Sequence, residues 1–259
     1  MSKSSRKLFG VIVCDSQAKW GGPEGIAKRI ENMLSIDNAE WKRYRAEYGE
    51  FPSEEELNTF QGFYITGSKH SVNDEAQTWI KKLELFIQKA HALKRPKVYG
   101  SCFGHQAIAK ALGGKVGANP SKQFICYNEE IVMYDEDLKC SKFLNHLKKI
   151  SDTKKFHMLQ SHGECVEELP PNAINVASSA SCKHEIILFS DNIVGCQSHA
   201  DFIKDDLSSI ILPSLLESNA ITKDEFDKAT ESLKRPDAGS DVAHGIQEFL
   251  CCETQSQLS

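Results

Sequence analysis

The stretch Gly100-Ser101-Cys102-Phe103-Gly104-His105-Gln106 holds a thiol between small residues, where an apolar segment meets a helical one. Residues 97–99 before it can run into a buried strand, and residues 106–112 after it contain helix formers and end at two glycines. The pattern predicts a strand, a tight turn and a helix. A side chain on such a turn projects from the carboxyl edge of a sheet, because the glycines leave room around it.

Cys102 is the candidate nucleophile on this turn. The first N–H groups of a helix and the positive end of its dipole stabilise a thiolate and can also hold an oxyanion. By itself, a Gly-x-Cys-x-Gly pattern equally fits a small buried cysteine in an ordinary turn. A candidate base elsewhere in the chain is therefore needed to favour a nucleophile over a buried structural cysteine.

A candidate partner lies at residues 193–202, where the apolar run Ile-Val-Gly-Cys ends in Gln-Ser-His-Ala-Asp-Phe. His199 can take the thiol proton and return it to a leaving group, while Asp201 can hold the imidazole in the required tautomer. His157 and His162 are alternative bases, since Glu164 stands two residues after His162. With His199 as the base, the order of the three residues along the chain is Cys102, His199, Asp201.

These motifs resemble those of the class I, or triad, glutamine amidotransferases. That family has Gly-x-Cys-x-Gly-x-Gln at the nucleophile, which matches residues 100–106, and a Gly-His-Pro-Glu-like segment at the base, which here reads Ser-His-Ala-Asp. Residues 161–170 resemble the Ser-His-Gly-Asp segment that borders the family's glutamine pocket. The resemblance covers about residues 9–202. Without a synthase domain the chain is most similar to the plant gamma-glutamyl peptidases, whose smaller motifs appear as Cys14-Asp15 and Phe51-Pro52-Ser53-Glu54.

The resemblance implies a hydrolase that cleaves gamma-glutamyl amide bonds through a thioester on Cys102. Glutathione or a glutathione conjugate would be the substrate, the N–H groups of Gly67 and Phe103 would form the oxyanion hole, and Gln106 would help to shape the pocket. It implies no cofactor and no obligatory protein partner. Two alternatives stay open. One is a glutaminase subunit that supplies ammonia to a separate synthase, and the other is a catalytically weak binding or regulatory homologue, because Asp201 is one methylene shorter than the family's glutamate.

Composition limits the classes of function. The chain has 259 residues, of which 40% are hydrophobic and 26% charged, which fits one sizeable soluble domain. A net charge of -5 does not indicate a basic surface for nucleic-acid binding. Nine cysteines without metal-ligand spacing favour a reducing compartment and no metal site. Since the apolar run 8–14 is too short for a signal peptide or a membrane span, the expected location is the cytosol.

The alternation of apolar and helical segments predicts an α/β fold: a mostly parallel central sheet with helices on both faces and an antiparallel extension, of the flavodoxin-like, class I glutamine amidotransferase-like type. Strands are expected at 8–14, 41–44 and 62–66, helices at 26–34 and 75–92, and antiparallel strands within 124–134 and 156–197. One domain would span 8–252 between tails at 1–7 and 253–259. Its C-terminal helices, within 206–252, would include a kink at Pro213 and caps at Thr222 and Ser240.

Overall fold

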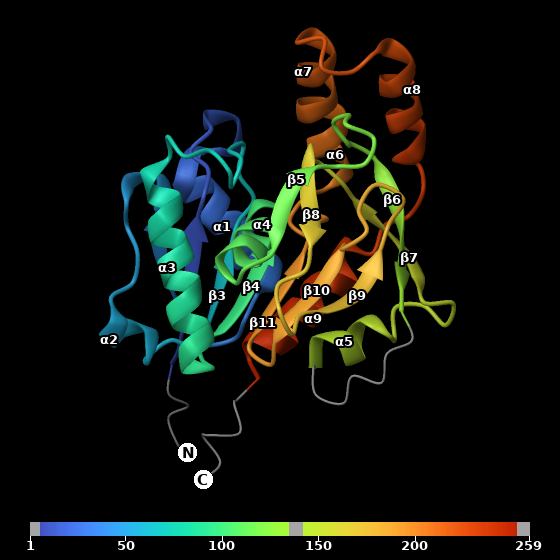
Figure 1. The fold of residues 1–259 in the computed structure, drawn as a ribbon. Coiled ribbons are helices and arrows are strands. Elements are labelled where there is room, and N and C mark those ends of the chain that lie inside the picture. The colour runs from blue at the N-terminus through green and yellow to red at the C-terminus, as the bar shows by residue number, and fades with distance from the viewer. Residues whose placement is uncertain (1–5, 135–141, 253–259) are drawn as a thin grey trace.

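The computed structural model describes residues 6–134 and 142–252. A nine-stranded sheet runs through the molecule in the order β2-β1-β3-β4-β11-β10-β9-β6-β7 (Figure 1). Its first five strands are parallel to one another: β2 (Ala39–Arg45), β1 (Lys7–Val13), β3 (Gly62–Ile65), β4 (Lys97–Ser101) and β11 (Ile193–Cys196). The remaining four pair antiparallel: β10 (Ile186–Ser190), β9 (Ile174–Ser178), β6 (Asn128–Met133) and β7 (Lys155–Leu159). The expected parallel sheet with an antiparallel extension is confirmed.

Helices cover both faces of the sheet (Figure 1). On one face, α1 (Gly22–Leu34) and α9 (Gly239–Leu250) share an apolar cluster that also takes in α5 (Lys142–Leu147). On the other face lie α3 (Thr78–Leu93) and α4 (Phe103–Ala111). The central strands β3, β4 and β11 are buried at every position, and most of their residues are apolar or glycine, as is typical of buried parallel strands.

Several short elements complete the chain. The 3-10 turns η1 (Ala18–Trp20) and η2 (Ala46–Tyr48) follow β1 and β2, and the two-stranded sheet β5 (Lys115–Ala118) and β8 (Glu164–Glu168) lies beside α4 (Figure 1). Ser53 is the N-cap of helix α2 (Glu54–Leu57), and its side chain forms a capping box with Glu56. Strand β1 begins one residue earlier than expected and α1 four residues earlier, since Pro23 fits the first turn of a helix.

The turn after β4 is fixed by close packing of α4 on the sheet. A Cβ atom at Gly104 would lie 2.5 Å from the carbonyl oxygen of Ile65 on β3. A Cβ atom at Gly100 would lie 2.6 Å from the carbonyl carbon of Gly104 and from Cδ1 of Ile108. Only glycine fits at either position, so the two glycines let the helix begin directly above the strand.

The C-terminal helices differ in detail from expectation. Helix α6 (Lys204–Asp206) continues through a π-helical segment, η3 (Leu207–Ile211), into α7 (Leu212–Glu217), so the irregularity expected at Pro213 precedes it as a π turn. Thr222 caps α8 (Lys223–Ser232) as expected. Ser240 is not a cap: α9 already begins at Gly239, whose N–H donates to the Asp237 carboxylate.

Candidate active site

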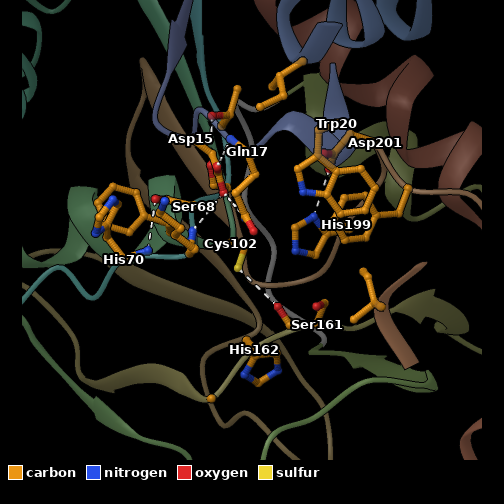
Figure 2. A pocket seen from close by; sticks show the side chains of 18 of the residues that line it. Asp15, Gln17, Trp20, Ser68, His70, Cys102, Ser161, His162, His199 and Asp201 are labelled. Carbon is orange, nitrogen blue, oxygen red and sulfur yellow. Dashed lines mark hydrogen bonds and ion pairs between the residues drawn. The ribbon is translucent and has the colours of Figure 1, made fainter. Parts of the chain in front are cut away.

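A cavity of about 410 Å³ lies at the edge of the sheet where β1, β3, β4 and β11 end (Figure 2). A residue that lines the cavity follows each of these strands: Asp15 follows β1, Gly67 follows β3, Cys102 follows β4 and His199 follows β11. Parallel strands end at one edge of a sheet, so residues far apart in sequence meet there. The predicted residues Cys102, Phe103, Gln106, His199, Asp201 and Gly67 all line this cavity.

Cys102 stands at the N-cap of α4 in an unusual backbone conformation. Its φ is 49° and its ψ is -104°, a region that non-glycine residues rarely adopt. Such strain persists only where the surrounding packing imposes it, and here Gly100 and Gly104 allow that packing. The side chain is mostly buried, and its sulfur lies 3.7 Å from the carbonyl oxygen of Ser161. The conformation turns the thiol toward the cavity (Figure 2).

His199 and Asp201 form a buried pair beside Cys102. The Nδ1 atom of His199 lies 3.1 Å from Oδ1 of Asp201. The hydroxyl of Ser101 also donates to this carboxylate, at 3.3 Å. Asp201 therefore reaches the imidazole although it is shorter than glutamate.

The other ring nitrogen of His199, Nε2, is buried and has no hydrogen-bond partner among the described residues. It lies on the side of the ring that faces Cys102 (Figure 2). The two side chains converge on Gly67, where an added Cβ atom would lie 3.1 Å from Cε1 of His199 and 3.7 Å from Cβ of Cys102. Nδ1 is thus engaged by the carboxylate, and Nε2 is left for the thiol proton.

Local charge determines the protonation of this pair. Burial by itself disfavours a charged imidazole, but the Asp201 carboxylate and the Cys102 thiolate outweigh it and raise the pKa of His199 to about 10. Burial likewise disfavours a charged Asp201, but the imidazolium beside it holds the pKa of Asp201 below its usual range. The surroundings of His199 therefore favour the imidazolium, which is the form that His199 takes when it holds the thiol proton.

A stack of aromatic rings fixes the plane of the imidazole. The ring of Phe202 lies parallel to that of His199, with centroids 3.9 Å apart and an interplanar angle of 2°. Trp20 stacks on Phe202 at 5.4 Å, and the guanidinium of Arg29 lies 5.5 Å from the Trp20 ring. Arg29 also donates to the carbonyl oxygen of Asp201. Sequence reasoning missed these residues. Only the position of Phe202, directly after Asp201, could have pointed to one of them.

Two backbone N–H groups flank Cys102. Phe103 is the first residue of α4, so its N–H has no acceptor within the helix. Within residues 6–134 and 142–252, neither this N–H nor that of Gly67 donates a hydrogen bond. Both groups are therefore free to bind an oxygen atom in the cavity.

Gln106 connects the cavity to the strands around it. Its Nε2 donates to the carbonyl oxygen of Glu164, at 2.8 Å, and to Oε1 of Gln197, at 3.1 Å. Gln197 in turn donates from Nε2 to the sulfur of Cys102, at 3.5 Å. Sequence reasoning gave no role to Gln197, although it lies two residues before His199.

The alternative bases are placed differently. His162 borders the cavity, but its Nδ1 lies 3.1 Å from the carbonyl oxygen of Glu164, while the Glu164 carboxylate accepts from Ser71. Burial lowers the pKa of His162 to about 4, which keeps its ring neutral. His157 lies on β7, opposite Glu130 of β6. Within residues 6–134 and 142–252, neither histidine has a carboxylate at hydrogen-bonding distance as His199 does.

His70 lies in the turn after β3. Its ring is half-buried, and its Nε2 lies 3.2 Å from Oε1 of Glu47. The edge of this ring also packs against Trp79 of α3. These contacts give His70 a structural role in holding the turn that contains Gly67.

In the part of the chain that the structure describes, no three His, Cys, Asp or Glu side chains lie together so that they could hold a metal ion. No helix among the same residues is long and apolar enough to span a membrane.

A cysteine on a strained turn, a histidine with one free nitrogen and an aspartate behind it are the groups that thiol-dependent acyl transfer requires. The chain belongs to the glutamine amidotransferase class-I family, whose model matches residues 28–213. It is 31% identical to gamma-glutamyl peptidase 4 of Arabidopsis thaliana over 82% of this chain and 81% of that protein, and 29% identical to gamma-glutamyl peptidase 3 over 88% and 90%. In fold it is similar to a glutamine amidotransferase of Thermotoga maritima, with a TM-score of 0.71 at 17% identity over 95% of this chain and 99% of that one.

Proposed function

We propose that this protein is a cysteine-dependent hydrolase of gamma-glutamyl amide bonds. The observation that carries the proposal is the orientation of His199, whose Nδ1 is held by Asp201 while its Nε2 is unpartnered on the side of Cys102. A thiol nucleophile requires such a base. The gamma-glutamyl peptidases among the relatives support the choice of bond.

In the acylation step, Cys102 transfers its proton to Nε2 of His199, and the sulfur attacks the gamma-carbonyl carbon of the substrate. The carbonyl oxygen becomes an oxyanion, and in this proposal the N–H groups of Gly67 and Phe103 bind it. Both residues line the cavity, and neither N–H has an acceptor among the described residues, which supports this role. When the tetrahedral intermediate collapses, the C–N bond breaks and His199 gives its proton to the departing amine. The product of this step is a gamma-glutamyl thioester on Cys102.

In the deacylation step, His199 removes a proton from a water molecule that attacks the thioester carbon. The C–S bond breaks, the proton returns from His199 to the sulfur, and glutamate leaves. Asp201 stabilises the imidazolium in both steps, as the raised pKa of His199 indicates. No cofactor is needed to balance either step.

Glutathione or a glutathione conjugate is the proposed substrate. The cavity is lined both by polar side chains, among them Asp15 and Ser68, and by apolar ones, from Trp20, Phe124 and Leu215. Polar groups suit a gamma-glutamyl group, and the apolar ones suit a substituent on the cysteinyl sulfur. The mixed lining supports a conjugate as one of the substrates to test.

The test is turnover by the purified chain alone, followed by mass spectrometry on glutathione, several S-conjugates and glutamine. Wild type should release glutamate from a conjugate, and Cys102→Ala should not. Cys126→Ala is the matched control and should keep wild-type turnover, because Cys126 is also buried but does not line the cavity.

The alternatives predict other outcomes of the same assay. A glutaminase subunit would release ammonia from glutamine only when a synthase partner is added. A regulatory homologue would bind conjugates without cutting them. Either result would overturn the proposed peptidase activity, whereas the 3.1 Å contact between His199 and Asp201 argues for a working base.

A further inference from the structure

Gln197 is a fully buried glutamine that the proposed mechanism does not use. It follows β11 directly, and its backbone N–H donates to the carbonyl oxygen of Glu185 on the antiparallel side of the sheet. A buried side-chain amide is costly unless its hydrogen bonds are made inside the protein. The partners of this amide therefore show what the residue does.

The hydrogen bonds fix which way the amide points. Gln106 donates from Nε2 to the carbonyl oxygen of Glu164 and to Oε1 of Gln197. Since Oε1 of Gln197 accepts at that end, its Nε2 occupies the other end, 3.5 Å from the sulfur of Cys102. The assignment of oxygen and nitrogen in this amide thus follows from its neighbours.

We propose that Gln197 is a positioning residue for Cys102, which holds the sulfur in place and favours its thiolate through an amide N–H···S hydrogen bond. Its Nε2 donates a hydrogen bond to this sulfur at 3.5 Å, from the strand end that also carries His199. The Ser161 carbonyl oxygen, 3.7 Å from the sulfur, can only accept from the thiol. When the thiol loses its proton, the contact with Ser161 becomes repulsive and that with Gln197 becomes stronger.

Other titratable groups surround the sulfur and remain when Gln197 is replaced. They line the cavity together with Cys102: Asp15 after β1, Lys69 and His70 after β3, His162 just before β8 and Glu164 at its start, and His199 and Asp201 after β11. A change in thiol reactivity on replacing Gln197 alone therefore reports the amide itself.

The experiment measures the alkylation rate of Cys102 by iodoacetamide between pH 5 and pH 10, quantified on the peptide that contains it. Gln197→Met should move the pH midpoint of alkylation upward by about one pH unit, which makes the reaction about tenfold slower below both midpoints. Gln197→Glu should move it further, because a carboxylate repels a thiolate. Gln106→Met, which frees the Gln197 amide to rotate, should give a smaller upward shift.

Gln160→Met is the matched control. Gln160 is equally buried, and its Nε2 donates to Glu185 but not to the sulfur. The Gln160→Met variant should have a lower melting temperature than wild type and the same alkylation midpoint. The inference would be overturned if Gln197→Met kept the wild-type midpoint, if Gln160→Met shifted it equally, or if wild-type Cys102 did not react.

The inference rests on Cys102 as the nucleophile of the proposed function. Alkylation requires no gamma-glutamyl substrate, so a wrong substrate class would leave the expected shift intact. Conversely, if wild type cleaves the substrate but Gln197→Met keeps the wild-type alkylation midpoint, the proposed role of Gln197 is wrong and the proposed hydrolase activity stands.

Discussion

Asp201→Asn is the change that tests the proposed catalytic pair most directly. The pKa of His199 is raised from 6.5 to about 10, and one pKa unit corresponds to about 1.4 kcal/mol, so the surroundings favour the imidazolium by about 5 kcal/mol. After burial, which opposes this, the Asp201 charge is the largest cause. Where the Asp201 charge supplies most of the energy that favours the imidazolium, removing this charge costs about 3 to 5 kcal/mol. This corresponds to a decrease of about 10²- to 10⁴-fold in kcat/KM.

Asparagine has nearly the size of aspartate, so the cavity should stay intact while the charge is lost. Its amide can also donate to Nδ1 of His199, which would place the ring proton on Nε2 and leave no acceptor for the thiol proton. The assay is kcat/KM for glutamate release at several pH values, with circular dichroism as the folding control. Activity within tenfold of wild type at neutral pH would refute the assigned role of Asp201.

Asp201→Glu provides the complementary test, because glutamate is the residue that the family pattern has at this place. The shorter carboxylate already contacts His199 at 3.1 Å and Ser101 at 3.3 Å in a buried site. An extra methylene there overpacks the site, at a cost of about 1 to 3 kcal/mol. The expected result is lower activity than wild type, and a faster enzyme would contradict the observed packing.

Three further predictions concern the fold, the base and pH. Gly104→Ala should lower the free energy of unfolding in urea by about 2 to 4 kcal/mol, since its Cβ would lie 2.5 Å from the Ile65 carbonyl oxygen; a smaller loss would contradict this close packing. Phe202→Leu should lower kcat about three- to tenfold by removing the ring stacked on His199, and an unchanged kcat would deny the stack a role. Burial raises the pKa of Glu185 from 4.5 to about 7, so the folded state binds its proton more tightly and stability should fall by about 3 kcal/mol as pH rises from about 4.5 to 7. Thermal melts of Glu185→Gln should lack this fall; if they keep it, another group is responsible.

The sequence predicted the strand, turn and helix around Cys102 because the physical requirements there are local. Buried parallel strands must be apolar, and a helix that packs this closely on a strand requires glycine at positions 100 and 104. The cap at Thr222 was predicted for the same reason, since it joins neighbouring residues. At Ser240 local reasoning failed, because Asp237, just before the helix, bonds the first N–H instead.

The groups that surround the candidate site were not predictable in this way. Trp20 and Arg29 come from η1 and α1, more than 170 residues before the Phe202 ring and the Asp201 carbonyl that they contact. No spacing along the chain signals such contacts. They arise because β1 and β11 end at one edge of the sheet.

The sequence by itself determined the α/β class, the tight turn and the residues that can do the chemistry, because these depend on residue types and on short spacings. Only the tertiary structure decided that Asp201 reaches His199, that Nε2 stays unpartnered, and that Gln197 points its amide at the sulfur. These relations depend on interatomic distances of 3.1 to 3.5 Å, which a small shift of the surrounding strands would change. Such distances are set by the packing of the whole sheet and its helices, which no local pattern encodes.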